Sequence, residues 1–135
     1  MSVEPFQSEQ LHVARLRLRV AATDAHYAGG LVAGAWVLGL FGDLATELCL
    51  AHDRQEGLMR AYDAVEFLAP IRAGDFVEAH GRFTEIGRTS RRFECEAWRV
   101  AELDPERGAS AGHLLIEPTL LARATGTVVV IVPPT

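Results

Sequence analysis

The amino-acid sequence predicts an α+β protein in which one long helix packs on one antiparallel sheet. One stretch, residues 31–52, has the composition and the three-and-four apolar spacing of a helix. The residues before it, and most of those after it, alternate between apolar and polar or form β-rich apolar runs. The chain has no internal repeat, so its 135 residues are expected to form a single domain, residues 1–135.

Composition excludes several classes of protein. Hydrophobic residues make up 49% of the chain and charged residues 23%, which supplies a core and excludes intrinsic disorder. No uncharged apolar run reaches the roughly 18–20 residues that span a bilayer. A net charge of −5 disfavours nucleic acid as a partner. We therefore expect neither membrane nor nucleic-acid binding, and residues 1–10 are expected to be a flexible extension rather than a secretory signal.

The first expected strand is residues 11–22. Apolar residues alternate there with Arg15, Arg17 and Arg19, so one face is expected to be buried and the other solvated. The alternation stops at residues 23–30, where turn-forming side chains and the pair Gly29-Gly30 precede the helix.

The expected helix at residues 31–52 carries an apolar stripe and an opposite stripe that includes Trp36, Asp43 and Glu47. Glycine occurs in it at Gly34, Gly39 and Gly42. Each glycine costs about 1 kcal/mol relative to alanine inside a helix. We therefore expect another part of the protein to approach this backbone closely.

Four more strands are expected after the helix, at residues 58–68, 76–86, 91–103 and 119–132, with a polar loop at residues 104–112. In the first of them, alternation places Glu66 on the face of Tyr62 and Ala64, and Asp63 on the face of Val65.

Cysteine and histidine usage predicts no metal site. Cys49 and Cys95 lie in apolar stretches without CxxC spacing, which favours buried, reduced thiols and a cytoplasmic location. Four histidines have no acidic or cysteine partner at metal-ligand spacing: His12, His52, His80 and His113.

The order strand, long helix, four strands is that of the hotdog fold, in which a curved antiparallel sheet of about five strands wraps one central helix. Several segments also resemble the 3-aminobutyryl-CoA ammonia lyases of bacterial lysine fermentation. They are DAHY at residues 24–27 with Gly29-Gly30, LFGDLATEL at 40–48, YDAVEFLAP at 62–70, AGDF at 73–76 and ARATGT at 122–127. The resemblance implies an enzyme that eliminates ammonia from a short 3-aminoacyl-CoA, with coenzyme A entering only as part of the substrate and no further cofactor.

Such an elimination needs a carboxylate or histidine that removes the α-hydrogen. Asp43 and Glu66 are the favoured proton-transfer groups, with Glu47 in support, because two carboxyls in one pocket suit this chemistry. The resemblance to hotdog proteins implies that the strand of Glu66 can meet the helix of the partner subunit. His26, whose ring the neighbouring Asp24 would orient, is the alternative.

The substrate needs hydrogen-bond donors at the thioester oxygen and cations at the coenzyme A phosphates. Backbone donors are expected from Gly29, Gly30 and Leu31 at the start of the helix, beside Tyr27, and phosphate contacts from Arg88, Ser90 and Arg91 at a strand turn. The simpler alternatives are that the glycines form an ordinary tight turn into the helix and that the arginines are solvated surface charges.

One helix cannot cover both ends of the sheet, so we expect a homodimer with a sheet continuous across two subunits. Hotdog proteins often assemble further, which predicts a hexamer. Two other functions stay open on the same scaffold: an acyl-CoA thioesterase, and a non-catalytic protein that binds acyl-CoA or another small ligand.

Overall fold

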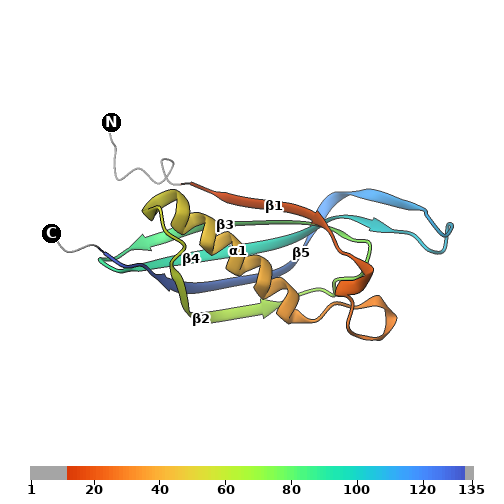
Figure 1. Cartoon of the computed structure of the whole chain (residues 1–135). Coiled ribbons are helices and arrows are strands. Elements are labelled where there is room, and N and C mark those ends of the chain that lie inside the picture. Colours follow the sequence, from red (N-terminus) through yellow and green to blue (C-terminus); the bar gives the residue numbers. More distant parts are fainter. Residues whose placement is uncertain (1–11, 133–135) are drawn as a thin grey trace.

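The structure is a computed structural model that describes residues 12–132. The expected extension at residues 1–10 lies outside the described residues. Helix α1 (Gly34–Asp53) lies on one face of a five-stranded antiparallel sheet, as Figure 1 shows. The strands are β1 (Ala14–Arg19), β2 (Leu58–Phe67), β3 (Phe76–Ile86), β4 (Ser90–Leu103) and β5 (Gly112–Val129), in the order β1-β3-β4-β5-β2. The predicted α+β hotdog fold is confirmed.

The core lies between α1 and the inner face of the sheet. Phe41, Leu44 and Leu48 of α1 are fully buried, and they belong to the same apolar cluster as Phe93 of β4. By length and mean hydropathy, 1.3 over its most apolar window, α1 is apolar enough to cross a membrane. Its buried stripe accounts for this composition, because the central helix of a hotdog fold has to bury one face against the sheet.

The helix begins three residues later than its composition predicts. Gly29 and Gly30 have φ angles of 75° and 74°, a left-handed conformation that glycine adopts without strain. Leu31 then forms isolated β-bridges with Tyr27 and Arg72 instead of entering the helix. The paired glycines therefore form a turn, and the first helical residue is Gly34.

β2 is an edge strand in which the alternation of side chains between the two faces of the sheet is interrupted. Its pairing with β5 shifts register between Met59 and Ala61 and again between Tyr62 and Ala64. After the second shift Glu66 pairs with Arg123 on the outer face of the sheet. The predicted faces of β2 are wrong at this point, because a bulge moves every later side chain to the other side.

β5 begins at Gly112, seven residues before the predicted start, so β4 and β5 form a long hairpin that extends past the sheet in Figure 1. Pro118 interrupts the β-rich pattern of the sequence, and residues 112–118 were not predicted as part of this strand. Pro118 lies in an irregular stretch between the pairs Arg99–Thr119 and Ala101–Leu114, where no ladder hydrogen bond is required of it.

Candidate active site

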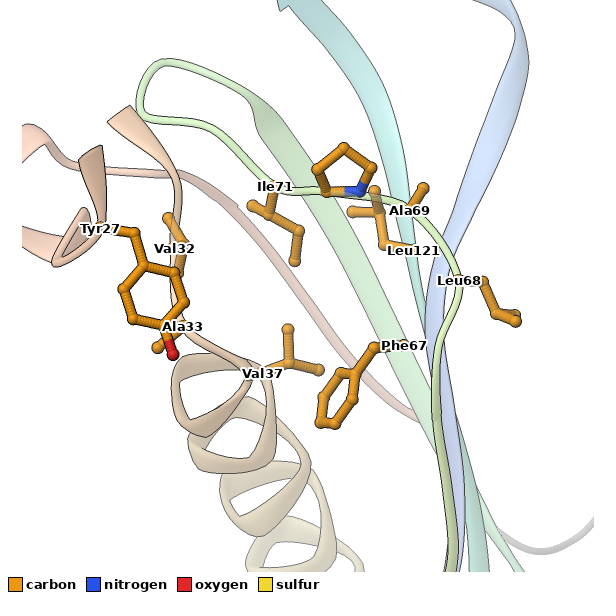
Figure 2. Close-up of a pocket in the computed structure, with 11 residues that line it drawn as sticks. Tyr27, Val32, Ala33, Val37, Phe67, Leu68, Ala69, Ile71 and Leu121 are labelled. Carbon is orange, nitrogen blue, oxygen red and sulfur yellow. The ribbon is translucent and has the colours of Figure 1, made fainter. Parts of the chain in front are cut away.

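A pocket of about 540 Å³ lies at the N-terminal end of α1. Figure 2 shows side chains from α1, the segment before it, the end of β2 and the following loop arranged around it. The lining residues are Tyr27, Val32, Ala33, Gly34, Val37, Phe67, Leu68, Ala69, Pro70, Ile71 and Leu121. The Tyr27 hydroxyl is the one polar side-chain group in this lining, so the pocket suits an alkyl or acyl chain.

The first turn of α1 supplies hydrogen-bond donors to this pocket. Ala33, the N-cap residue, has no side chain that can accept a hydrogen bond. Within residues 12–132, no acceptor pairs with the backbone N–H groups of Gly34 and Ala35. A helix N-terminus with free N–H groups attracts negative charge. Gly34 lines the pocket, so its N–H group, with that of Ala35 next to it, is the candidate donor there.

The predicted donors Gly29, Gly30 and Leu31 are not at the helix N-terminus. The Gly30 carbonyl accepts a hydrogen bond from the Ala73 N–H at 2.9 Å, which ties the turn to the loop before β3. Of the predicted substrate-binding group, only Tyr27 lines the pocket.

Asp43 lies on the exposed face of α1, away from the sheet. It is nine residues after Gly34, about 13 Å along the helix axis, and so is not in the pocket of its own chain. Among the described residues no cation or hydrogen-bond donor pairs with its carboxylate. Glu47, one turn later, does have a partner: its Oε2 lies 2.5 Å from Nε2 of His12. Glu47 is therefore engaged by an ion pair, whereas the carboxylate of Asp43 is open to solvent in the single chain.

Glu66 and Asp43 do not meet within one chain. Glu66 forms an ion pair with Arg123 on the outer face of the sheet, whereas Asp43 is on the helix that covers the inner face. Asp63 is also on the outer face, where Arg92 Nη2 lies 3.1 Å from each of its carboxylate oxygens. The hydrogen bond from Arg92 lowers the pKa of the Asp63 carboxyl. The single chain therefore does not bring Asp43 and Glu66 together, and their expected meeting between two subunits stays a prediction.

His26 and Asp24 do not form the predicted pair either. Asp24 Oδ2 accepts a hydrogen bond from the Ala21 N–H at 3.1 Å, so it stabilises a short turn. His26 is exposed and does not line the pocket.

Arg91 is a structural residue. Its side chain is 7% exposed and binds both carboxylate oxygens of Asp53, with Nε–Oδ2 at 3.0 Å and Nη2–Oδ1 at 2.7 Å. Its Nη1 donates to the carbonyls of Gly87 and Ser90. The hydrogen bonds that Arg91 donates to Asp53 lower the pKa of the Asp53 carboxyl. Four of the five N–H groups of Arg91 are therefore used within the protein, so the structure gives no support to the expected contact between Arg91 and a coenzyme A phosphate.

The turn that holds Arg88, Ser90 and Arg91 lies at the opposite end of α1 from the pocket. Arg91 is bonded to Asp53, the last residue of the helix, whereas the pocket surrounds Gly34, the first. Arg88 is exposed, and it remains the one arginine of the three-residue group that can still bind a phosphate.

Sequence reasoning missed ionic clusters that the fold assembles. Each of the four histidines without a predicted partner has one: His12 with Glu47, His52 with Asp53, His80 with Glu96, and His113 with Asp104 and Glu102. His113, Asp104 and Glu102 lie within reach of one metal ion. Arg99 Nε is 3.1 Å from Glu102 Oε1, and His113 Nδ1 is 2.6 Å from Asp104 Oδ2.

Both cysteines are buried and unpaired, as predicted. Burial raises the pKa of the Cys49 thiol to about 11 and that of Cys95 to about 12. Thiols with such pKa values are not nucleophiles at neutral pH.

Comparison with known proteins identifies the family of this chain. The sequence profile of the Thioesterase superfamily matches residues 29–105. The 3-aminobutyryl-CoA ammonia lyase of Acetoanaerobium sticklandii is 50% identical over 115 residues, which cover 85% of this chain and 91% of that protein. The structure of β-alanyl-CoA:ammonia lyase from Clostridium propionicum matches with a TM-score of 0.84 and 35% identity, over 88% of this chain and 85% of the other.

More distant structures share the fold alone. An apo-hexameric acyl-CoA thioesterase superposes with a TM-score of 0.73 and 21% identity, over 96% of this chain and 74% of the other. The profile match covers more than half of the chain, and the lyase relative is matched over nearly its whole length. The chain therefore belongs to the thioesterase superfamily and, within it, to the family of the CoA-thioester ammonia lyases.

Proposed function

We propose that this protein is a carbon–nitrogen lyase that eliminates ammonia from a short 3-aminoacyl-CoA, such as 3-aminobutyryl-CoA, and that also catalyses the reverse addition. The observation that carries the proposal is the 50% identity to a 3-aminobutyryl-CoA ammonia lyase over most of both chains. The apolar pocket beside the start of α1 supports the acyl part of this substrate, because the hydrocarbon chain of a short acyl thioester is apolar.

The chemistry follows from the thioester. A base removes the α-proton, and the electron pair of that C–H bond becomes the carbon–carbon double bond. The bond to the β-nitrogen, protonated as an ammonium group, breaks, and its electron pair leaves with the nitrogen as ammonia. Negative charge develops on the thioester oxygen during proton removal. We place this oxygen at the N–H groups of Gly34 and Ala35, where fixed donors stabilise the charge without rearrangement.

The base has to come from outside the pocket of a single chain. Within the described residues, neither a carboxylate nor a histidine lines the pocket. Asp43 is exposed on α1, and a Cβ atom added at Gly39 or Gly42 on the same helix would meet nothing within 4 Å. We propose that a second subunit approaches this open face, so that Asp43 of one subunit serves the pocket of the other.

The edge strand β2 supports this arrangement. Its unpaired side can extend the sheet into a second copy, and Leu58, Met59 and Phe67 are exposed apolar residues along it. A sheet continued through β2 keeps its two faces distinct, so Glu66 stays on the outer face in the assembly as well. Glu66 therefore stabilises the surface of the sheet and takes no part in proton transfer.

Self-association is the first expected result. Light scattering at micromolar concentration should give the mass of a dimer or of a larger, even-numbered assembly, with the hexamer as our specific proposal. A chain with this unpaired edge and this open helix face leaves apolar surface exposed as a monomer. A monodisperse monomer would contradict both the assembly and the shared site.

The second expected result concerns the reaction. Incubation with 3-aminobutyryl-CoA should release ammonia and produce enoyl-CoA absorbance, without release of free thiol. Thiol release detected with a thiol reagent would instead identify an acyl-CoA thioesterase. A change in melting temperature with coenzyme A ligands, without either product, would identify a binding protein.

Three further predictions concern the location of the protein, its cofactors and its partners. We propose a cytoplasmic location, which the two buried, unpaired thiols support, because a reducing compartment preserves them. We also propose that the reaction needs no cofactor or metal, because the thioester itself acidifies the α-hydrogen, and that nucleic acid and membranes are not partners.

A further inference from the structure

The ring of Phe67, which lines the pocket, packs directly against the backbone of Gly34. A Cβ atom on Gly34 would lie 2.8 Å from Cζ and 2.9 Å from Cε1 of Phe67, well inside van der Waals contact. The ring therefore occupies the space that a side chain on the first residue of α1 would fill. Figure 2 shows it at this end of the helix, beside Val37.

The backbone of Phe67 is fixed while much of its side chain is not needed for the core. Its Cα pairs in the β2–β5 register with that of Ala122, whose side chain is buried on the inner face. The Phe67 side chain is nevertheless 55% exposed. The ring can therefore be removed without opening a cavity in the core, and the variant is expected to fold. Because Phe67 also lies on the β2 edge that we propose joins two subunits, light scattering has to verify that the variant assembles.

We infer that Phe67, seated on Gly34, is the wall that limits the length of the acyl chain this enzyme accepts. The inference rests on the proposed function, because it requires a CoA thioester in the pocket. A thioester oxygen held by the N–H groups of Gly34 and Ala35 places the acyl chain beside the Phe67 ring. The rest of the lining near this end is apolar, from Val32, Val37 and Ile71, so the ring limits length and not polarity.

Binding of unreactive thioesters tests the wall independently of turnover. Dissociation constants of butyryl-, hexanoyl- and octanoyl-CoA are measured for the wild type and for Phe67→Ala. We expect the wild type to bind butyryl-CoA best. Phe67→Ala should improve the affinity for hexanoyl-CoA relative to butyryl-CoA by about tenfold, since two more methylene groups become buried.

Leu58→Ala is the matched control. Leu58 is an apolar residue on the same strand, 73% exposed, and it does not line the pocket. Its replacement removes apolar surface from β2 and should leave the ratio of hexanoyl-CoA to butyryl-CoA affinity unchanged.

A double-mutant cycle tests the contact with Gly34. Gly34→Ala displaces the ring and should change the chain-length ratio in the wild-type background. In the Phe67→Ala background the same substitution has no ring to displace and should leave the ratio unchanged. Strong non-additivity of this kind is the signature of a direct contact.

The outcomes separate the wall from the proposed function. Ammonia release by the wild type decides the reaction, whatever the chain-length profile. An unchanged ratio in Phe67→Ala, an equal shift in Leu58→Ala, or additive effects in the cycle would each overturn the wall. Failure of the wild type to bind any of the three thioesters would overturn it as well.

Discussion

Asp43→Asn is expected to lower kcat for ammonia elimination by about 100-fold or more while the protein still folds and assembles. The amide keeps the shape and the hydrogen-bonding capacity of the carboxylate and removes its ability to accept the α-proton, and general-base catalysis contributes on this scale. Steady-state kinetics on 3-aminobutyryl-CoA, with light scattering to verify assembly, measures the effect. The mutation should reduce kcat more than it changes KM, because the base acts in the transition state.

Glu66→Gln is the paired measurement. Glu66 also lies within a segment that resembles the lyases, but it is held by Arg123 on the outer face of the sheet. Its amide variant should retain wild-type kcat. Wild-type kcat in Asp43→Asn would show that another group moves the proton, and a comparable loss in Glu66→Gln would show that the outer face takes part in the site.

A mixed dimer tests whether the base comes from the second subunit. If Asp43 serves the partner's pocket, then a dimer of one Asp43→Asn chain and one chain with a blocked pocket has one active site, which combines the intact pocket of the first chain with Asp43 of the second. If Asp43 instead serves the pocket of its own chain, both sites of this mixed dimer carry one defect and the dimer is inactive. Complementation by mixing two inactive homodimers is therefore expected, and its absence would place Asp43 and the pocket within one chain.

Arg91→Ala is expected to destabilise the protein by about 3 kcal/mol and to lower Tm by about 10 °C. The substitution leaves the Asp53 carboxylate, 12% exposed, without the guanidinium that neutralises it. It also removes the donors to the Gly87 and Ser90 carbonyls, which hold the β3–β4 turn against the end of α1. Thermal and urea unfolding measure the loss, and the affinity for coenzyme A should not fall.

Arg88→Ala is the matched control on the same turn. Arg88 is exposed, so its replacement should change stability by no more than about 0.5 kcal/mol. A large stability loss in Arg88→Ala, or a loss of coenzyme A affinity without a stability loss in Arg91→Ala, would restore the phosphate-binding role to this turn.

The same ion pair predicts a pH dependence. Because Arg91 lowers the pKa of Asp53 in the folded state, the pair contributes stability above the unfolded-state pKa of about 3.9. This contribution is lost as the pH falls through the folded-state pKa. The stability difference between the wild type and Arg91→Ala should therefore be constant from neutral pH to about pH 4 and should narrow below it.

The local patterns of the sequence determined most of the fold. The alternation around Arg15, Arg17 and Arg19 identified β1 and its solvated face, since period-2 spacing has one structural meaning. The apolar stripe identified α1 to within three residues at its start. Segments that resemble the ammonia lyases then indicated the hotdog fold and the reaction class, because residue identities hold information that periodicity does not.

Only the tertiary structure decided which side chains share a site. The bulge after Tyr62 moved Glu66 to the outer face, and no feature of the sequence marks the position of a bulge. The sequence predicted a phosphate contact for Arg91, whereas the fold brings Asp53, 38 residues earlier in the chain, against its guanidinium group. The contact between Gly34 and the Phe67 ring depends on the same kind of information. Local pattern fixes the elements and their faces, but pairings between distant residues depend on register and packing, which are properties of the folded chain as a whole.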